Sequence, residues 1–434
     1  MTSAVSVKRI LNGRTKLDFS DLFVPVGRDR FFSTFWTRQA VHLRHEGRTF
    51  DAYFGWDALN TILNARDLFL PKVKVSRSDH PVPSEQFTTD SAAGDRLVDP
   101  RAVLNLFREG ASFGITGADS HWAPLRSVIN GIHDELLESV HANVYCSPPN
   151  TQGFQCHFDL HEVFVLQVEG AKHWKVFRPT TEAPVESWRA EDAPDASTEP
   201  YVDVVLRKGD ILYVPRGHWH YAVAEDSISL HVTVGVTCRK GTAFLDWLTH
   251  EVSGDAGWRR NAPLMNTSGT GGTFRAAPEL VEWGSGLRRA LVEKLSEEDL
   301  FERFCRDTFG SIQPRDNVEM PIQVAGDIPV ASLVFERPLG RHHFITDSGG
   351  GAVAVTVGGS EIQLEGVKPA LIRTIFDADS FTFAELRHAH PDVPANDVSD
   401  LIAELVRSGL LLTRQASHVS PTLGGDQPGS APGN

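Results

Sequence analysis

Short predicted strands separated by turn residues fill residues 141–237, and this pattern constrains the fold more than any other feature of the chain. Apolar runs such as 163–168 and 211–214 are typical of strands, whereas Pro148 and Gly209 are typical of turns. Short strands in such close succession, without helical patterns between them, indicate a double-sheet jelly roll and not a parallel sheet.

A His-x-Asp pair, His157 and Asp159, lies in this region. In an extended strand the side chains at positions i and i+2 point to the same face, so one imidazole and one carboxylate can reach a single metal ion. His218 and His220 follow the predicted strand 211–214, and either could supply a third ligand. Two histidines and one carboxylate on one face of an octahedron are typical of non-haem Fe(II) oxygenases.

Lys172 begins the predicted strand that returns after the turn at Gly170 and Ala171. On that neighbouring strand its ammonium group could point into the same cavity as the His-x-Asp pair. A fixed ammonium group there would hold a carboxylate as a point charge.

Five spaced motifs occur in a fixed order along the chain. They are Asn143-x-Tyr145, Pro148-Pro149-x-x-x-Gly153, His157-x-Asp159, Gly170-x-Lys172-x-Trp174 and Pro215-x-Gly217-x-x-His220. Together they resemble the JmjC-type oxygenases of the cupin superfamily, and within them the ribosomal oxygenases, over roughly residues 18–413. The resemblance implies a JmjC domain of jelly-roll (double-stranded β-helix) fold, mainly β with α, followed by a helical dimerisation segment and a C-terminal winged helix.

The resemblance also implies a set of cofactors and site residues. Fe(II) would be held by His157, Asp159 and His220, and the remaining positions would serve 2-oxoglutarate and O2. The distal carboxylate of 2-oxoglutarate would bind Lys172 and the Tyr145 hydroxyl. Asn143 and Thr151 would be polar neighbours, and His231 would line the cosubstrate cavity, with a core histidine as the equal alternative for His231.

The other histidines near the motifs have less specific interpretations. The spacing of the last motif favours His220 over His218 as the third ligand. His161 is expected beside the ligands or exposed, and His173 is expected to face away from Lys172.

The implied function is hydroxylation of an Arg or His side chain, in a ribosomal protein or another basic protein or peptide. The same chemistry on a biosynthetic peptide or small molecule is an alternative, and a non-catalytic cupin-like binding scaffold is another. A histone-type demethylase is less favoured, because the sequence lacks zinc-ligand clusters for reader domains.

Charge and cysteine content limit the partners and the compartment. The 434 residues carry a net charge of −14, which argues against direct binding to nucleic-acid phosphates and suits a basic partner. The four cysteines form no paired framework, which favours a reducing cytoplasm. We find no apolar run of membrane-spanning length and no signal-peptide core.

The chain is predicted to divide into four parts, namely the catalytic domain 1–240, a helical dimerisation region 241–312, a winged-helix-like domain 313–413 and a disordered tail 414–434. A short helix leading into a strand is expected at 31–43. Helices are expected at 57–63, 101–109, 122–138, 241–252, 276–308, 369–377, 382–389 and 395–408, a hairpin with a Gly-Gly turn at 353–364, a strand at 410–412, and loops at 76–97, 178–200 and 253–275. The last domain is not basic, so we expect a structural or protein-interaction role, and the helical region predicts a homodimer through the family resemblance.

Overall fold

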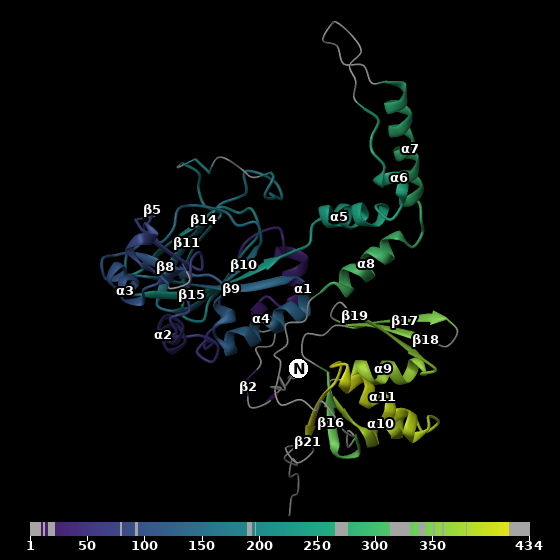
Figure 1. Cartoon of the computed structure of the whole chain (residues 1–434). Helices are drawn as coiled ribbons and strands as arrows, with labels where there is room; N and C mark the ends of the chain where they lie inside the picture. The colour runs from purple at the N-terminus through teal and green to yellow at the C-terminus, as the bar shows by residue number, and fades with distance from the viewer. Residues whose placement is uncertain are drawn as a thin grey trace, which may run out of the picture. The chain divides into compact units, whose positions relative to one another are not determined.

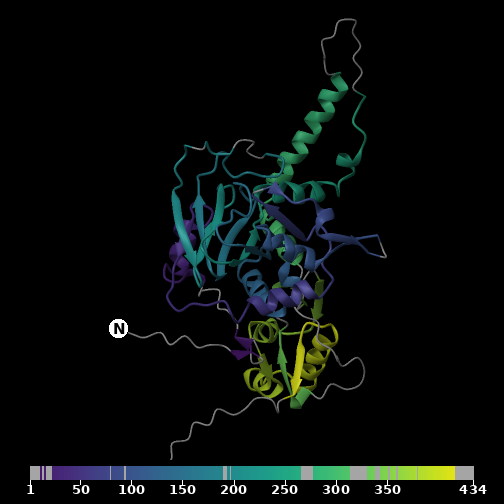
Figure 2. The ribbon, with the colours of Figure 1, turned by 90° about the vertical axis from the view of Figure 1, so that its left-hand side faces the viewer.

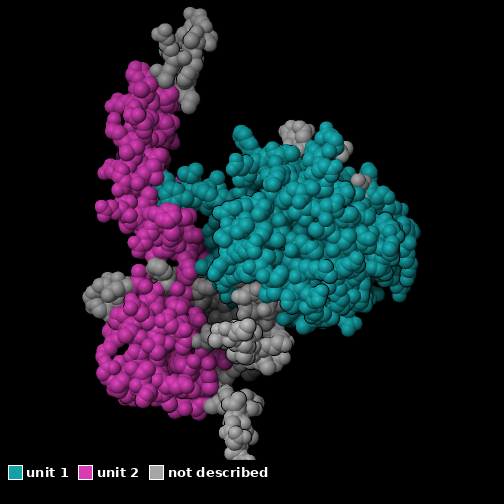
Figure 3. Space-filling model, turned by 180° about the vertical axis from the view of Figure 1, so that it is seen from behind, with its two compact units in different colours: residues 1–248 teal, residues 249–434 magenta. Residues whose placement is uncertain are grey.

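The computed structural model describes residues 10–11, 14–15, 22–78, 80–91, 94–188, 193–195, 197–264, 277–312, 330–337, 343–349, 352–357, 360–378 and 380–415. The chain forms two compact units, residues 1–248 and 249–434 (Figure 3). Most of the predicted tail 414–434 and residues 265–275 of the predicted loop 253–275 lie outside the described residues, and the four predicted domain boundaries stay predictions. The described part of that loop differs from the prediction, because it includes the short helix α6 (Ala256–Arg259).

Two main antiparallel sheets build the first unit (Figures 1 and 2). The larger sheet has the spatial order β3 (Val41–Leu43), β13 (Ile211–Val214), β10 (Glu162–Glu169), β15 (Ser229–Thr237), β9 (Ser139–Ser147), β8 (Ser112–Ile115), β4 (Val73–Arg77) and β5 (His80–Pro81). The smaller sheet has the order β12 (Val202–Arg207), β11 (Ala171–Val176) and β14 (His220–Ala224). This arrangement confirms the jelly roll predicted from the strand pattern.

Side chains on the central strands alternate between two environments, as the two-residue period of a strand requires. On β9, Val144 and Cys146 enter the main hydrophobic core, whereas Asn143 and Tyr145 line a cavity. On β15, Val232 and Val234 enter the same core, and His231 and Thr233 face the cavity. One face of the large sheet therefore stabilises the fold, and the other carries polar side chains.

Helices cover the apolar face of the large sheet. They are α1 (Arg28–Arg30), a π-helical turn (Phe31–Phe35), α2 (Trp56–Asn64), α3 (Pro100–Arg108) and α4 (Ala123–Leu136). The aromatic residues of the π-helical turn belong to the core. The centroid of the Phe31 ring lies 5.7 Å from that of Phe164 on β10 and 4.9 Å from that of Tyr213 on β13. Asp99 caps α3 by accepting a hydrogen bond from the backbone N–H of Arg101.

Residues 76–97 differ from the predicted surface loop. β4 and β5 pair there, and β6 (Thr88–Asp90) pairs with β7 (Arg96–Val98). The strand signal was weak because these strands are short and β5 contains Pro81, which is typical of a sheet edge. Residues 79, 92 and 93 lie outside the described part.

The second unit contains helices and two small sheets. Its helices are α6 (Ala256–Arg259), α7 (Pro278–Leu295), α8 (Leu300–Gly310), α9 (Pro369–Asp377), α10 (Phe383–Ala389) and α11 (Ala395–Arg407), and α5 (Gly241–Val252) connects the two units. One sheet has the order β20 (Ser380–Thr382), β16 (Leu333–Glu336) and β21 (Leu412–Gln415), and the other has the order β17 (His343–Gly349), β18 (Ala352–Val357) and β19 (Ser360–Glu365).

Two predictions for this unit were wrong in detail. The single helix expected at 276–308 is two helices, because the chain turns at Ser296–Asp299 between α7 and α8. The last strand begins at Leu412 and not at 410, since Leu410 and Leu411 are buried in the turn before it. The Gly-Gly turn at 358–359 lies outside the described residues, and the winged helix stays a prediction. No helix among the described residues has the length and apolarity to cross a membrane.

Candidate metal centre

A pair of backbone hydrogen bonds joins the two histidines of the predicted triad. The N–H of His157 donates to the carbonyl of His220 at 3.1 Å, and the N–H of His220 donates to the carbonyl of His157 at 2.7 Å. The N–H of Gly217 donates to the carbonyl of Asp159 at 2.9 Å, which fixes the turn before β14 against the same segment. The sheet pairing therefore brings together residues that are distant in sequence.

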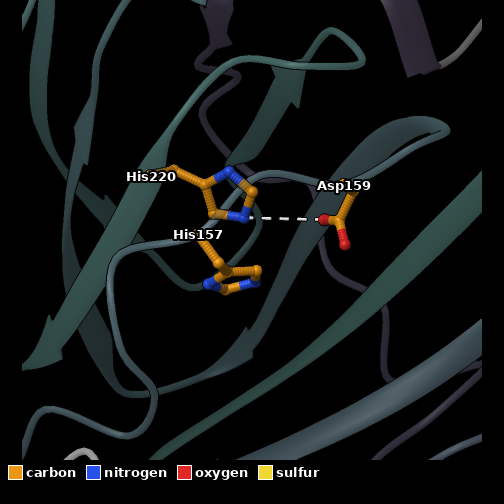
Figure 4. Close-up of side chains that lie close together, drawn as sticks. All are labelled: His157, Asp159 and His220. Atoms are coloured by element: carbon orange, nitrogen blue, oxygen red, sulfur yellow. Dashed lines mark ion pairs between the residues drawn. The ribbon is translucent and has the colours of Figure 1, made fainter. Parts of the chain in front are cut away.

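His157, Asp159 and His220 converge in space (Figure 4). One ligand atom from each residue lies within 4.8 Å of the other two, and His220 Nε2 lies 3.6 Å from Asp159 Oδ2. Among the described residues this is the one group of three or more His, Cys, Asp or Glu side chains placed to hold a metal ion. Its composition is that of a facial triad, which leaves several coordination positions open.

Both imidazoles are fixed by their second ring nitrogen. Nδ1 of His157 donates to the carbonyl of Gln155 at 2.7 Å, and Nδ1 of His220 donates to the carbonyl of His218 at 3.0 Å. These bonds place the proton on Nδ1 and leave the Nε2 lone pair for a metal ion.

The charge states at the triad also suit a cation. Burial, together with the nearby His157 ring, lowers the pKa of His220 to about 4, so the ring is neutral at neutral pH. Burial acts to raise the pKa of Asp159, but the surrounding imidazoles, His220 foremost, outweigh it and hold that pKa below its usual value. The site therefore offers an anionic carboxylate and a neutral His220 imidazole.

The triad opens into a cavity of about 690 Å³ between the two sheets. Its lining combines residues of β9, β10, β11, β14 and β15 with the β4–β5 region: Leu70, Pro71, Val73, Lys74, Val75, Ser76, Pro81, Val82, Ser84, Phe87, Asn143, Tyr145, Phe154, Gln155, His157, Asp159, His161, Val163, Lys172, Trp174, His220, Tyr221, Ala222, His231 and Thr233. The cavity has room for a small molecule at the triad and a further group beside β4.

Lys172 enters this cavity from β11 and is 3% exposed. Its Nζ donates to the Ser147 hydroxyl at 2.9 Å, and no described carboxylate forms an ion pair with it. Burial lowers the pKa of Lys172 to about 8, so the ammonium form still dominates at neutral pH. A buried cation without a partner anion is costly, which indicates that the cavity is built for an anionic ligand.

Tyr145 lies beside this cation. Its hydroxyl hydrogen-bonds with Asn143 and Thr233, and burial, helped by the Asp159 charge, raises the pKa of Tyr145 to about 12. The hydroxyl therefore keeps its proton and can donate. A Cβ atom at Gly114 would come within 2.7 Å of Tyr145 Cε1, so only glycine on β8 leaves room for this ring.

His231 is buried beside the same ring. It stacks on Tyr145 with 5.2 Å between ring centroids, and its Nδ1 has no hydrogen-bond partner. Burial lowers the pKa of His231 well below its usual value, which keeps the ring neutral next to Lys172. Asn143, Tyr145, Lys172 and His231 thus gather on one side of the cavity.

The remaining predicted residues take no part in the triad. Thr151 does not line the cavity, and its hydroxyl donates to the carbonyl of Pro149 at 3.0 Å. The His218 ring bonds to Tyr201 and not to the triad. His161 lines the cavity near His141, with 5.1 Å between ring centroids, and His173 is partly exposed and pairs with Asp203.

Sequence reasoning missed Ser147, Thr233 and His141 near the site. Ser147 lies two residues after Tyr145 on β9, and Thr233 lies two residues after His231 on β15. The two-residue period of a strand could therefore have identified both as residues of the cavity side. His141 lies at the same alternate position of β9 as Asn143 and Tyr145, so this period applied to it as well. Its place beside His161 also depends on the pairing of β9 with β15 at Gly235, which the sequence does not show.

Comparisons with known proteins agree with this geometry. A family model described as the JmjC domain matches residues 123–244. The chain is 33% identical over 217 residues to the bifunctional lysine-specific demethylase and histidyl-hydroxylase NO66 of Drosophila willistoni, covering 49% of this chain and 28% of that protein. It is 31% identical over 223 residues to human ribosomal oxygenase 1, covering 50% of this chain and 34% of that protein.

A solved structure extends the similarity of fold. The crystal structure of ycfD from Escherichia coli matches with a TM-score of 0.54 and 17% identity, and the match covers 89% of this chain and 98% of that one. The chain spans about a third of the length of the two curated relatives, whereas it spans nearly all of ycfD. Residues 123–244 match the JmjC domain, and over about half of its length the chain is similar to human ribosomal oxygenase 1.

Proposed function

We propose that this protein is an Fe(II)- and 2-oxoglutarate-dependent hydroxylase. The observation that carries the proposal is the convergence of His157, Asp159 and His220 at a cavity that also contains the buried, anion-free Lys172. Two imidazoles and one carboxylate fit Fe(II), and the open positions suit 2-oxoglutarate and O2. When bound, iron and 2-oxoglutarate supply the oxidation that inserts one atom of O2 into a C–H bond.

The residues of the chain would bind and orient the cosubstrate. Lys172 would form a charge-assisted hydrogen bond with the distal carboxylate, and the protonated Tyr145 hydroxyl would donate to the same group. Asn143 would orient Tyr145, and His231 would close the cavity behind it with a neutral, mostly apolar surface. Thr151 is left out of the proposed site, because it lies outside the cavity lining.

The proposed substrate is a side chain of a ribosomal protein. Two relatives support this proposal, since one is named a ribosomal oxygenase and the other is named in part a histidyl-hydroxylase. Basic ribosomal proteins would also be attracted to a chain with a net charge of −14.

The cavity lining favours histidine over arginine as the target. Asp159 is the one carboxylate among the described residues that line the cavity, and we assign it to the metal. A guanidinium group would therefore enter without a free anion to pair with, beside the cations of Lys74 and Lys172. A neutral imidazole meets no such cost.

Product analysis tests this function. The protein is incubated with Fe(II), 2-oxoglutarate and a complete set of ribosomal proteins, and products are located by tandem mass spectrometry. We expect one histidine that is heavier by one oxygen atom. Turnover of 2-oxoglutarate without a ribosomal product would favour a peptide or small-molecule substrate. Absence of both turnover and cosubstrate binding would favour the binding scaffold.

We further propose a homodimer through the helical region. No residue of α7 is buried, and Val281, Val292 and Leu295 are 55%, 59% and 48% exposed. A second copy of the chain is the proposed occupant of this apolar face. Sedimentation velocity should give a dimer for the wild type and a monomer for a Val281→Asp, Val292→Asp variant. The cytoplasmic location stays a prediction.

A further inference from the structure

A chain of hydrogen bonds lies behind His220, on the side away from the cavity. His220 Nδ1 donates to the carbonyl of His218 at 3.0 Å. The His218 ring in turn bonds through its own Nδ1 to the Tyr201 hydroxyl at 2.6 Å. The Tyr201 hydroxyl also bonds to the backbone N–H of Ala40 at 2.9 Å. The chain connects the segment before β3 to the first residue of β14.

The direction of each bond follows from the donors available. The N–H of Ala40 can only donate, so the Tyr201 oxygen accepts there. The Tyr201 hydroxyl keeps its proton for a second bond, and we assign that proton to a bond donated to His218 Nδ1, with the His218 proton on Nε2. The Ala40 N–H, the Tyr201 hydroxyl and the His218 ring therefore form a continuous chain of hydrogen bonds that fixes the His218 side chain.

Packing holds this chain of hydrogen bonds in place. His218 and His220 are each 4% exposed, and the N–H of His218 donates to the carbonyl of Pro215 at 3.2 Å. The Arg178 guanidinium group lies 4.8 Å from the centroid of the Tyr201 ring. Residue 218 is thus held through both its backbone N–H and its ring. Its carbonyl accepts the bond from His220 Nδ1.

We propose that Tyr201 and His218 are positioning residues, which fix the His218 carbonyl so that His220 keeps its proton on Nδ1 and presents Nε2 to the metal. The proposal rests on the proposed function, because it assigns His220 to a metal site. His218, which the sequence left open as an alternative third ligand, thereby has a different role. Partners of a ligand's second nitrogen typically change metal affinity by about 10-fold to 100-fold.

Four variants test the proposal. Tyr201→Phe removes the donor to His218, and His218→Leu removes the acceptor. His218→Asn is the conservative variant, because its amide oxygen lies the same number of bonds from the backbone as Nδ1 of histidine. Tyr213→Phe is the control. Like the Tyr201 hydroxyl, the Tyr213 hydroxyl donates to a buried acceptor, Glu162, and accepts from a backbone N–H, that of Thr37 at 2.8 Å.

The first readout is the affinity for Co²⁺, titrated into the metal-free full-length protein and followed by its visible absorption, with thermal unfolding of each metal-free variant recorded alongside. Tyr201→Phe and His218→Leu should bind Co²⁺ about tenfold more weakly than the wild type. His218→Asn should bind nearly as well as the wild type. Tyr213→Phe should unfold at a lower temperature and keep its affinity. An equal loss of affinity in Tyr213→Phe would overturn the proposal, since general loosening would then explain the effect.

The second readout needs no metal. Long-range proton–nitrogen NMR spectra of the metal-free protein report which nitrogen of His220 carries the proton. We expect the Nδ1–H form in the wild type and in His218→Asn, and a mixture of both forms in Tyr201→Phe and His218→Leu. An unchanged His220 tautomer in both of these variants would contradict the proposal, whatever the wild type does with metal. Failure of the wild type to bind Co²⁺, with the expected tautomers, would instead count against the proposed function.

Discussion

The two units of the chain differ in what they bury. Every buried polar or charged side chain among the described residues lies in the first unit, between positions 76 and 231: Ser76, Thr88, Ser112, His133, Ser147, Glu162, Gln167, Lys172, Asp210, His218, His220, Ser229 and His231. The described core of the second unit is apolar throughout, and in it Phe335 stacks on Phe381.

This difference indicates that the first unit carries the chemistry and that the core of the second unit serves stability. Burying a polar group costs free energy unless a partner compensates it, so a core built for stability alone avoids such groups. The first unit keeps a lysine and three histidines buried around one cavity or directly behind it. The second unit contributes packing and surface, and we expect its core to be replaceable without effect on the metal centre.

Loss of a triad ligand should give the largest effect. His157→Ala removes one of three ligands, and we expect the affinity for Fe(II) or Mn²⁺ to fall by more than about 100-fold, with loss of 2-oxoglutarate turnover. The matched control is His173→Ala, which removes a partly exposed histidine of β11. Isothermal titration with Mn²⁺ measures both, and wild-type affinity in His157→Ala would refute the ligand assignment.

A core variant of the second unit sharpens the contrast. Phe335 is fully buried, so Phe335→Ala should lower the free energy of unfolding by about 3–5 kcal/mol, whereas Phe335→Leu should cost less. Denaturant unfolding followed by hydrogen exchange gives the size and place of the loss. We expect an unchanged Mn²⁺ affinity in the folded variant, and a weakened metal site would show that the two cores are coupled.

Lys172 should control cosubstrate affinity in a pH-dependent way. A charge-assisted hydrogen bond contributes about 1.5–3 kcal/mol, so Lys172→Met should weaken 2-oxoglutarate binding by about 10-fold to 100-fold. Burial lowers the pKa of this lysine to about 8, so the free protein loses the needed charge as pH rises above that value, and wild-type affinity should fall there. Calorimetry on the manganese-loaded protein measures both effects.

The control for this variant is Lys175→Met, which lies on the same strand and pairs with Asp203 at 3.8 Å. It should bind 2-oxoglutarate like the wild type at every pH. If Lys172→Met kept the wild-type decline at high pH, the titrating group would be another residue.

His231 should give the smallest effect, on stability. Burial holds its pKa well below the value of 6.5 that it regains on unfolding, so only the unfolded chain takes up a proton at mildly acidic pH. Its stabilising contribution is complete above about pH 6.5 and decreases as pH falls. Between about pH 7 and pH 5 the free energy of unfolding should therefore fall by about 1–2 kcal/mol less in His231→Gln than in the wild type. Urea unfolding of the metal-free protein at each pH tests this, and identical slopes for both proteins would contradict it.

The sequence predicted the parts of this structure that depend on local pattern. The alternation on β9 and β15 and the helices α2 to α5 follow from periodicity, and the motif order brought out the triad and Lys172. What it missed depends on contacts between distant segments. Ala40 meets Tyr201, and His141 meets His161, only after the sheets have paired. The break between α7 and α8 falls in a stretch, Ser296–Asp299, whose residues are also compatible with a continuous helix.

The most direct test of the central claim is an anaerobic titration of the protein with Fe(II) and 2-oxoglutarate, followed in the visible range. Chelation of iron by 2-oxoglutarate at the triad should produce a weak charge-transfer band that disappears when O2 is admitted. The same titration of His157→Ala should produce no band. If well-folded wild-type protein also gave no band, the triad would not hold a working iron site, and the binding-scaffold function would replace the hydroxylase.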